Sequence, residues 1–152
     1  MELENIGKKV LEKDIEAFEN KYGVTIPKEY QEFLFKTNGG DPTEFICTPE
    51  FEETDEDGEV FMQSINIDHF FSLDQVKEEY EANREDPMFE ETYLPVALDS
   101  SGNYVLIGMS GENEGKVYFG DHEAYDDETE LIRLFLINDS FTDFINSLFA
   151  ME

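Results

Sequence analysis

Apolar residues in the first part of the chain recur at the spacing of a helix. The positions that share one helical face are Leu3, Ile6, Val10, Leu11, Ile15 and Phe18. This pattern predicts an amphipathic helix that runs to about Lys21 and is ended by Gly23. A second helix is predicted over residues 27–37, because proline suits a first helical turn and the Asn-Gly-Gly sequence that follows tolerates positive φ.

The middle of the chain consists of short apolar runs separated by turn residues, a pattern typical of strands. The predicted strands are residues 45–48, 60–67, 93–97, 103–109, 116–120 and 131–137, the last of them central or half-buried. Residues 49–58 are predicted to form an acidic loop. A third helix is expected at about residues 74–83, capped by Ser72 or Asp74, and a last helix at residues 141–149.

Helices at both ends and strands in the middle indicate an α+β fold with a mainly antiparallel sheet. We expect a single domain over residues 1–152, with two N-terminal helices, a central sheet with one inserted helix, and a C-terminal helix. Hydrophobic residues make up 39% of the chain and aromatic residues 14%. Disordered acidic chains are poor in such residues, so the composition indicates a packed core.

The charge of the chain narrows the choice of partners. Acidic side chains number 38 against 10 basic ones, for a formal net charge of −28. Binding to a nucleic acid backbone or to an anionic membrane is disfavoured, because both depend on Lys and Arg. A cationic partner protein is favoured, since the field of the acidic chain accelerates its approach. The alternative is that the acidity only keeps the protein soluble.

Features of the chain favour a cytoplasmic location. Cys47 is the lone cysteine, so no disulfide forms within the chain, which suits a reducing compartment. The first 15 residues contain no apolar signal-peptide region, and no apolar run approaches the ~18 residues of a membrane span.

Three motifs carry a resemblance to a known family. Residues 26–34 read Ile-Pro-Lys-Glu-Tyr-Gln-Glu-Phe-Leu and precede Asn38-Gly39-Gly40. Residues 99–103 read Asp-Ser-Ser-Gly-Asn, and residues 140–145 read Ser-Phe-Thr-Asp-Phe-Ile. In this order the motifs resemble those of the SUKH superfamily, over nearly the whole chain. The resemblance implies a SUKH-like domain with the helix-helix-sheet-helix order predicted above.

The resemblance also implies a function. Many bacterial members of the superfamily are immunity proteins, which bind and neutralise the nuclease or other effector domain of a polymorphic toxin. Eukaryotic members act in cell-wall regulation. We interpret the signature residues as structural, because they start a helix, pack and turn the chain. They are Ile26, Pro27, Tyr30, Phe33, Leu34, Asn38, Gly39, Gly40, Phe141 and Phe144.

The sequence offers little for catalysis or cofactor binding. His69 and His122 are scattered and, with Cys47, are too few for a zinc site. Residues 53–60 partly imitate a calcium-binding EF-hand loop, but Ser64 stands where a bidentate glutamate is expected, so a solvated acidic loop is the simpler reading. No nucleophile or phosphate-binding motif is present. We therefore predict a protein that is not an enzyme and has no cofactor, catalytic residue or metal site.

The acidic surface is the remaining candidate for function. Acidic residues concentrate in residues 50–59, 78–91 and 121–130, with aromatic residues as candidate anchors, Phe51, Tyr80, Phe89, Tyr93 and Tyr125. The candidate partner-binding residues are Glu50, Phe51, Glu52, Glu53, Asp55, Glu56, Asp57, Glu59, Glu90, Glu91, Tyr93, Asp121, Glu123, Tyr125, Asp126 and Asp127.

These observations lead to one hypothesis and two alternatives. We predict a cytoplasmic immunity protein that occludes a basic toxin domain stoichiometrically, with a nuclease as the expected target. The first alternative is a regulatory scaffold that binds an ordinary cellular protein. The second is a calcium or small-ligand sensor that uses residues 53–59.

Overall fold

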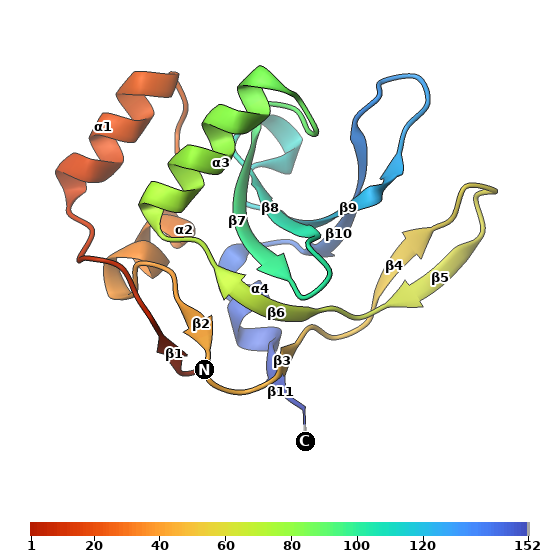
Figure 1. Cartoon of the computed structure of the whole chain (residues 1–152), viewed down its shortest axis with the longest axis horizontal. Coiled ribbons are helices and arrows are strands. Elements are labelled where there is room, and N and C mark those ends of the chain that lie inside the picture. The colour runs from red at the N-terminus through yellow and green to blue at the C-terminus, as the bar shows by residue number, and fades with distance from the viewer. Residues whose placement is uncertain (152) are drawn as a thin grey trace.

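The computed structural model describes residues 1–151 and confirms the α+β prediction (Figure 1). The helices are α1 Glu12–Tyr22, α2 Lys28–Lys36, α3 Leu73–Glu85 and α4 Phe141–Ser147, with a short 3-10 turn at Gly111–Asn113. The strands are β1 Leu3–Glu4, β2 Asp41–Pro42, β3 Ile46–Cys47, β4 Phe51–Thr54, β5 Val60–Gln63, β6 Asn66–Phe70, β7 Tyr93–Asp99, β8 Tyr104–Gly108, β9 Val117–Tyr125, β10 Ile132–Asn138 and β11 Phe149–Ala150.

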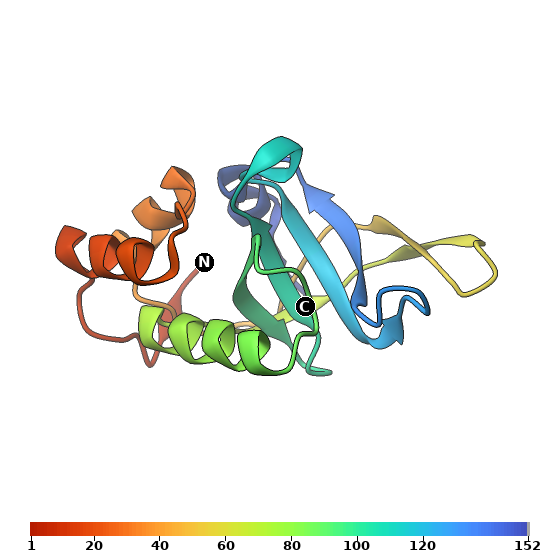
Figure 2. The same ribbon diagram turned by 90° about the horizontal axis from the view of Figure 1, so that it is seen from above.

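Seven of the strands form one antiparallel sheet in the order β10-β9-β8-β7-β6-β3-β11. The inserted helix α3 packs beside β7, and α1 lies next to α3 at one end of the molecule (Figures 1 and 2). The strand predicted at residues 131–137 is β10, which is half-buried as expected but lies at an edge of the sheet. The last helix is shorter than predicted, because Phe149 pairs with Cys47 as part of β11.

The predicted beginning of the first helix is wrong. It starts at Glu12 instead of Leu3, and Leu3 lies in β1, paired with β2. The intervening segment is held in place by hydrogen bonds to the turn after α2: the Gly7 amide donates to the Asn38 carbonyl at 2.9 Å. These long-range bonds outweigh the local helical periodicity, which is a weak preference. The predicted end is confirmed, since Gly23 caps α1 with a φ of 67°.

The Asn38-Gly39 turn joins three parts of the fold. The Asn38 side chain accepts a hydrogen bond from the Leu73 amide at the start of α3 and donates one to the Lys8 carbonyl, each at 2.7 Å. Gly39 has a φ of 71°, and a Cβ there would lie 2.5 Å from the Ser72 nitrogen. Such a position accepts glycine alone, so this part of the signature sequence sets how α2, α3 and the N-terminal segment meet.

Aromatic residues of the signature pack α2 against α4. Tyr30 and Phe33 of α2 both contact the ring of Phe141, with centroids 5.1 and 5.2 Å apart. Phe144 lies 5.8 Å from Phe141 and is fully buried. Ile26 and Leu34 are also buried, at 1% and 0% exposure. These side chains all pack in the core, and all but the half-buried Phe33 are inaccessible to a partner.

The acidic loop predicted at residues 49–58 is instead part of a β-hairpin. Residues 51–54 form β4 and pair with β5, and Figures 1 and 2 show this hairpin projecting from the end of the molecule opposite α1. Acidic residues have low strand propensity, which hid β4 from the composition argument. The predicted strand 60–67 is correspondingly two strands, β5 and β6, separated where Ile65 exchanges hydrogen bonds with Thr48.

Candidate partner-binding surface

Two of the three acidic segments lie side by side. Arg133 on β10 donates hydrogen bonds from Nη1 to the backbone carbonyls of Thr54 and Asp55, at 3.0 and 3.1 Å. Phe51 on β4 packs against Phe119 on β9, with ring centroids 5.5 Å apart. These contacts fasten the β4–β5 hairpin to the β9–β10 hairpin, so residues 50–59 and 121–130 share one end of the molecule (Figure 1).

The exposed carboxylates of these two hairpins form what we call the acidic end. They are Glu50, Glu52, Glu56, Asp57, Glu59, Glu123, Asp126, Asp127, Glu128 and Glu130. Asp55 and Asp121 are half-buried. The Asp55 carboxylate accepts hydrogen bonds from the amides of Asp57 and Glu59, both at 2.9 Å, and so organises the hairpin turn. This turn is the structural role of the sequence that imitates an EF-hand loop.

The third acidic segment meets the other two at a hollow. Glu90 and Tyr93, which follow α3, line a cavity of about 380 Å³ together with Thr54, Asp126 and Arg133. Glu90 and Glu91 are exposed and Tyr93 is half-buried. Glu90 and Tyr93 therefore lie next to Asp126 of the acidic end.

Three of the predicted aromatic anchors lie in the core. Phe51, Tyr80 and Phe89 are 5%, 2% and 3% exposed, so these predictions were wrong. In β4, successive side chains point to opposite faces, and Phe51 turns inward where Glu52 turns outward. Tyr125, at 49% exposure, remains available at the surface.

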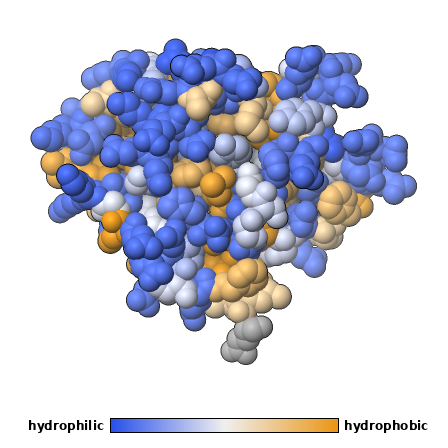
Figure 3. Space-filling view, viewed as in Figure 1, coloured by the Kyte–Doolittle hydropathy of each residue, from blue (hydrophilic) through white to orange (hydrophobic). Residues whose placement is uncertain are grey.

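The sequence analysis missed the apolar residues of β5. Val60, Phe61 and Met62 are 59%, 40% and 52% exposed. We call these three residues the apolar edge. Figure 3 shows hydrophobic surface on the projecting hairpin directly beside hydrophilic residues. An uninterrupted apolar triplet directly after an acidic run was the available signal. The triplet stands at the start of the strand predicted over residues 60–67.

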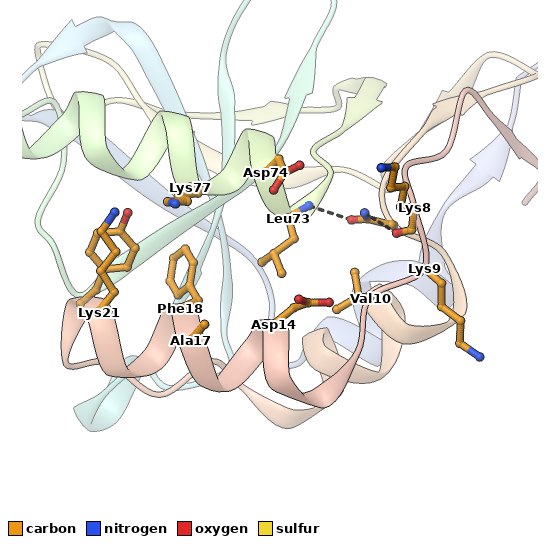
Figure 4. A pocket seen from close by; sticks show the side chains of 12 residues that line it. Lys8, Lys9, Val10, Asp14, Ala17, Phe18, Lys21, Leu73, Asp74 and Lys77 are labelled. Atoms are coloured by element: carbon orange, nitrogen blue, oxygen red, sulfur yellow. Dashed lines mark hydrogen bonds between the residues drawn. The ribbon is translucent and has the colours of Figure 1, made fainter.

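Positive charge collects at the other end of the molecule. Four of the chain's ten basic side chains line a cavity of about 350 Å³ between α1 and α3: Lys8, Lys9, Lys21 and Lys77 (Figure 4). We call this cavity the lysine groove. The carboxylates of Asp14 and Asp74 line it as well, and the Lys21 ammonium pairs with the Glu81 carboxylate at 2.9 Å. The groove is therefore a less favourable surface for a basic protein than the acidic end is.

A family model described as the SMI1 / KNR4 family (SUKH-1) matches residues 9–147. The chain belongs to the SUKH-1 family. This confirms the resemblance inferred from the three motifs. Membership is consistent with an immunity protein and with a protein as the partner. No curated protein matches the chain.

The two histidines of this SUKH-1 domain contact polar side chains of the fold. His69 contacts the Asp41 carboxylate at 2.5 Å through Nδ1 and the Gln75 side chain at 2.7 Å through Nε2, which links β2, β6 and α3. His122 contacts the Asn103 side chain. Cys47 is buried and free. Within residues 1–151, no three or more His, Cys, Asp or Glu side chains converge on a point where a metal would bind.

The helices of the SUKH-1 domain are too short or too polar to span a membrane, as far as residues 1–151 show.

Glu53 differs from the other acidic residues of the hairpin because it is only 4% exposed. Burial raises the pKa of its carboxyl above the usual 4.5, and the negative charge of Asp121 adds to the rise. The folded SUKH-1 domain therefore holds the Glu53 proton more tightly than the unfolded chain does. It follows that ionisation of Glu53 lowers the free energy of unfolding as the pH rises from about 4.5 towards neutrality.

We expect Glu53→Gln to raise the melting temperature at neutral pH, and the gain to disappear below about pH 4.5, where Glu53 is protonated in both states. Thermal unfolding followed by circular dichroism across this pH range measures the effect. Glu52→Gln is the matched control, because it removes the same charge from an exposed neighbour. Equal changes in the two variants would show that burial of Glu53 has no influence on stability.

Proposed function

We propose that this SUKH-1 protein is an immunity protein that binds and neutralises a basic toxin domain by covering it stoichiometrically. The observation that carries the proposal is the apolar edge, which is exposed on β5 beside the carboxylates of the acidic end. Charge alone accounts for solubility, but an exposed apolar triplet in a charged surround is typical of a protein-binding surface. We propose that residues 1–152 act as one domain in the cytoplasm, where the lone thiol of Cys47 stays reduced.

The two kinds of residue have different roles in the proposed complex. The carboxylates of the acidic end attract and orient the partner, which mainly raises the association rate. The apolar edge contributes affinity, because a few apolar anchors at the centre of an interface carry most of the binding free energy. A nuclease domain fits this surface best, since it binds phosphates with the Lys and Arg side chains that the carboxylates would pair with.

The proposal is tested by co-expressing the protein with any basic toxin domain that a neighbouring gene encodes and recording growth. Neutralisation restores growth, and purification of the mixture yields an equimolar complex. Growth arrest despite a folded, abundant protein would contradict the immunity role. A complex with an unrelated cellular protein in place of the toxin domain would favour the regulatory scaffold.

Charge-reversal variants distinguish the effect of the acidic end on association from the effect of the overall net charge. We expect the triple variant Glu56→Lys, Asp57→Lys, Glu59→Lys to lower the association rate with the toxin domain by about tenfold or more at low salt. The difference should shrink as salt screens the charges. Stopped-flow fluorescence measures both.

The matched control reverses three exposed carboxylates of α1 and α2: Glu12→Lys, Glu16→Lys and Glu32→Lys. It changes the net charge by the same amount. If the control slows association as much as the hairpin variant does, the acidic end is not the surface that steers the partner.

A further inference from the structure

The free edge of β5 is unusual for a strand at a protein surface. One side of β5 pairs with β4, and within residues 1–151 its other side faces no strand. Exposed strand edges are normally protected by Lys, Pro, a bulge or a covering segment, because they pair readily with other chains. Along β5, Val60, Phe61 and Met62 offer no charge and no proline.

The hairpin register shows which backbone groups point outward. The Asp55 amide donates to the Glu59 carbonyl at 2.9 Å at the turn, so this pair is hydrogen-bonded. In an antiparallel ladder, hydrogen-bonded and non-hydrogen-bonded pairs alternate. Phe61, opposite Glu53, therefore bonds to β4, whereas Val60 and Met62 direct their N–H and C=O groups to the free side.

This edge is preorganised. Arg133 holds the two carbonyls at the end of β4, and the Phe51 ring anchors the opposite end of that strand on Phe119. The ladder pairs Phe51 with Gln63 and Thr54 with Val60, so β5 is fixed over its whole length. Adding a strand here therefore costs this protein little further conformational entropy.

We infer that β5 binds an extended segment of the basic partner as an added strand, so that the β4–β5 sheet gains a third strand. Backbone hydrogen bonds to Val60 and Met62 hold the segment, and its Lys or Arg side chains pair with the flanking carboxylates of Glu52, Glu56 and Glu59. The same carboxylates oppose pairing between two copies of this chain. The inference rests on the proposed function for the identity of the partner that supplies the segment. The geometry of strand addition does not depend on that function.

The test uses the whole protein labelled with ¹⁵N and two short peptides of equal charge. One is acetyl-Lys-Val-Lys-Val-Lys-Val-amide, which can form a strand, and the other is acetyl-Lys-Pro-Lys-Pro-Lys-Pro-amide, which lacks the backbone donors at alternate positions. With the valine peptide, we expect the Val60 and Met62 amide signals to shift and their hydrogen exchange to slow by about tenfold. The proline peptide should leave that exchange unchanged.

A pair of variants distinguishes the contribution of the β5 backbone to peptide binding from that of the side chain. Met62→Pro removes an outward amide, which an edge strand tolerates, whereas Met62→Ala removes only the side chain. We expect Met62→Pro to bind the valine peptide about tenfold more weakly than Met62→Ala, the value of about one hydrogen bond. Amide contacts between Glu53 and Phe61 in the NMR spectra verify that the hairpin is intact.

Equal binding of the two peptides, equal affinity of the two variants, or dimers formed through β5 would overturn the inference. So would absence of any shift at Val60 and Met62 at millimolar valine peptide. Failure of the proposed function has a different signature: peptide binding at β5 by a protein that does not neutralise the toxin domain. Neutralisation without protection of the β5 amides would leave the proposed function standing and reject strand addition.

Discussion

The double variant Phe61→Ser, Met62→Ser should bind the toxin domain about 100-fold more weakly than the unmodified protein, because it removes two apolar anchors from the proposed interface centre. Both side chains are exposed, at 40% and 52%, so their loss should change the free energy of unfolding by less than about 1 kcal/mol. Calorimetric titration gives the affinity, and urea unfolding verifies the stability.

The control for this variant is Leu11→Ser, Phe45→Ser. These two side chains are 45% and 57% exposed and lie outside both hairpins of the acidic end. The control should bind with unchanged affinity. If both double variants lose affinity equally, the effect reflects general surface hydrophobicity. If neither does, the apolar edge is no part of the interface.

Gly39→Ala should destabilise the fold strongly, by about 2–4 kcal/mol. The new methyl group would lie 2.5 Å from the Ser72 nitrogen and 2.6 Å from the Phe70 carbonyl oxygen, both backbone atoms that cannot step aside. The φ of 71° adds the strain of a left-handed conformation. Urea unfolding of the variant measures the loss.

The control variant Gly102→Ala distinguishes the steric clash from the conformational strain as causes of this loss. Gly102 has a φ of 84°, but a Cβ there would meet nothing within 4 Å. This control should lose only the conformational part, about 1–2 kcal/mol. An equal loss in the two variants would show that the close approach of the Asn38-Gly39 turn to the start of α3 contributes nothing to stability.

The elements that sequence patterns predicted well are those with local signals. The third helix begins after Ser72, which forms a capping box with Gln75, and the last begins after Ser140, whose hydroxyl accepts the Asp143 amide. The beginning of α1 was mispredicted because it is decided by hydrogen bonds to Asn38, which is distant in sequence. Periodicity carries no information about such contacts.

The charge of the candidate surface could be predicted from the sequence, but the exposure of its individual residues could not. Composition identified the acidic segments, and the folded chain brings residues 50–59 and 121–130 to one end of the molecule. Whether an aromatic residue points inward depends on what covers it: Phe51 is buried by Phe119, and the nearby Phe61 is covered by nothing comparable. The gathering of lysines between α1 and α3 was equally invisible, because it depends on how two helices distant in sequence pack together.

The most direct test of a basic partner at the acidic end is affinity capture of the tagged protein from its own cells. It is run at about 50 and about 300 mM salt with the unmodified protein, the Phe61→Ser, Met62→Ser variant and its Leu11→Ser, Phe45→Ser control. We predict a stoichiometric polypeptide with a basic domain, held by the unmodified protein and the control, lost by the variant and retained more weakly at high salt. An acidic partner, or a partner that the Phe61→Ser, Met62→Ser variant still holds with full strength at both salt concentrations, would contradict it.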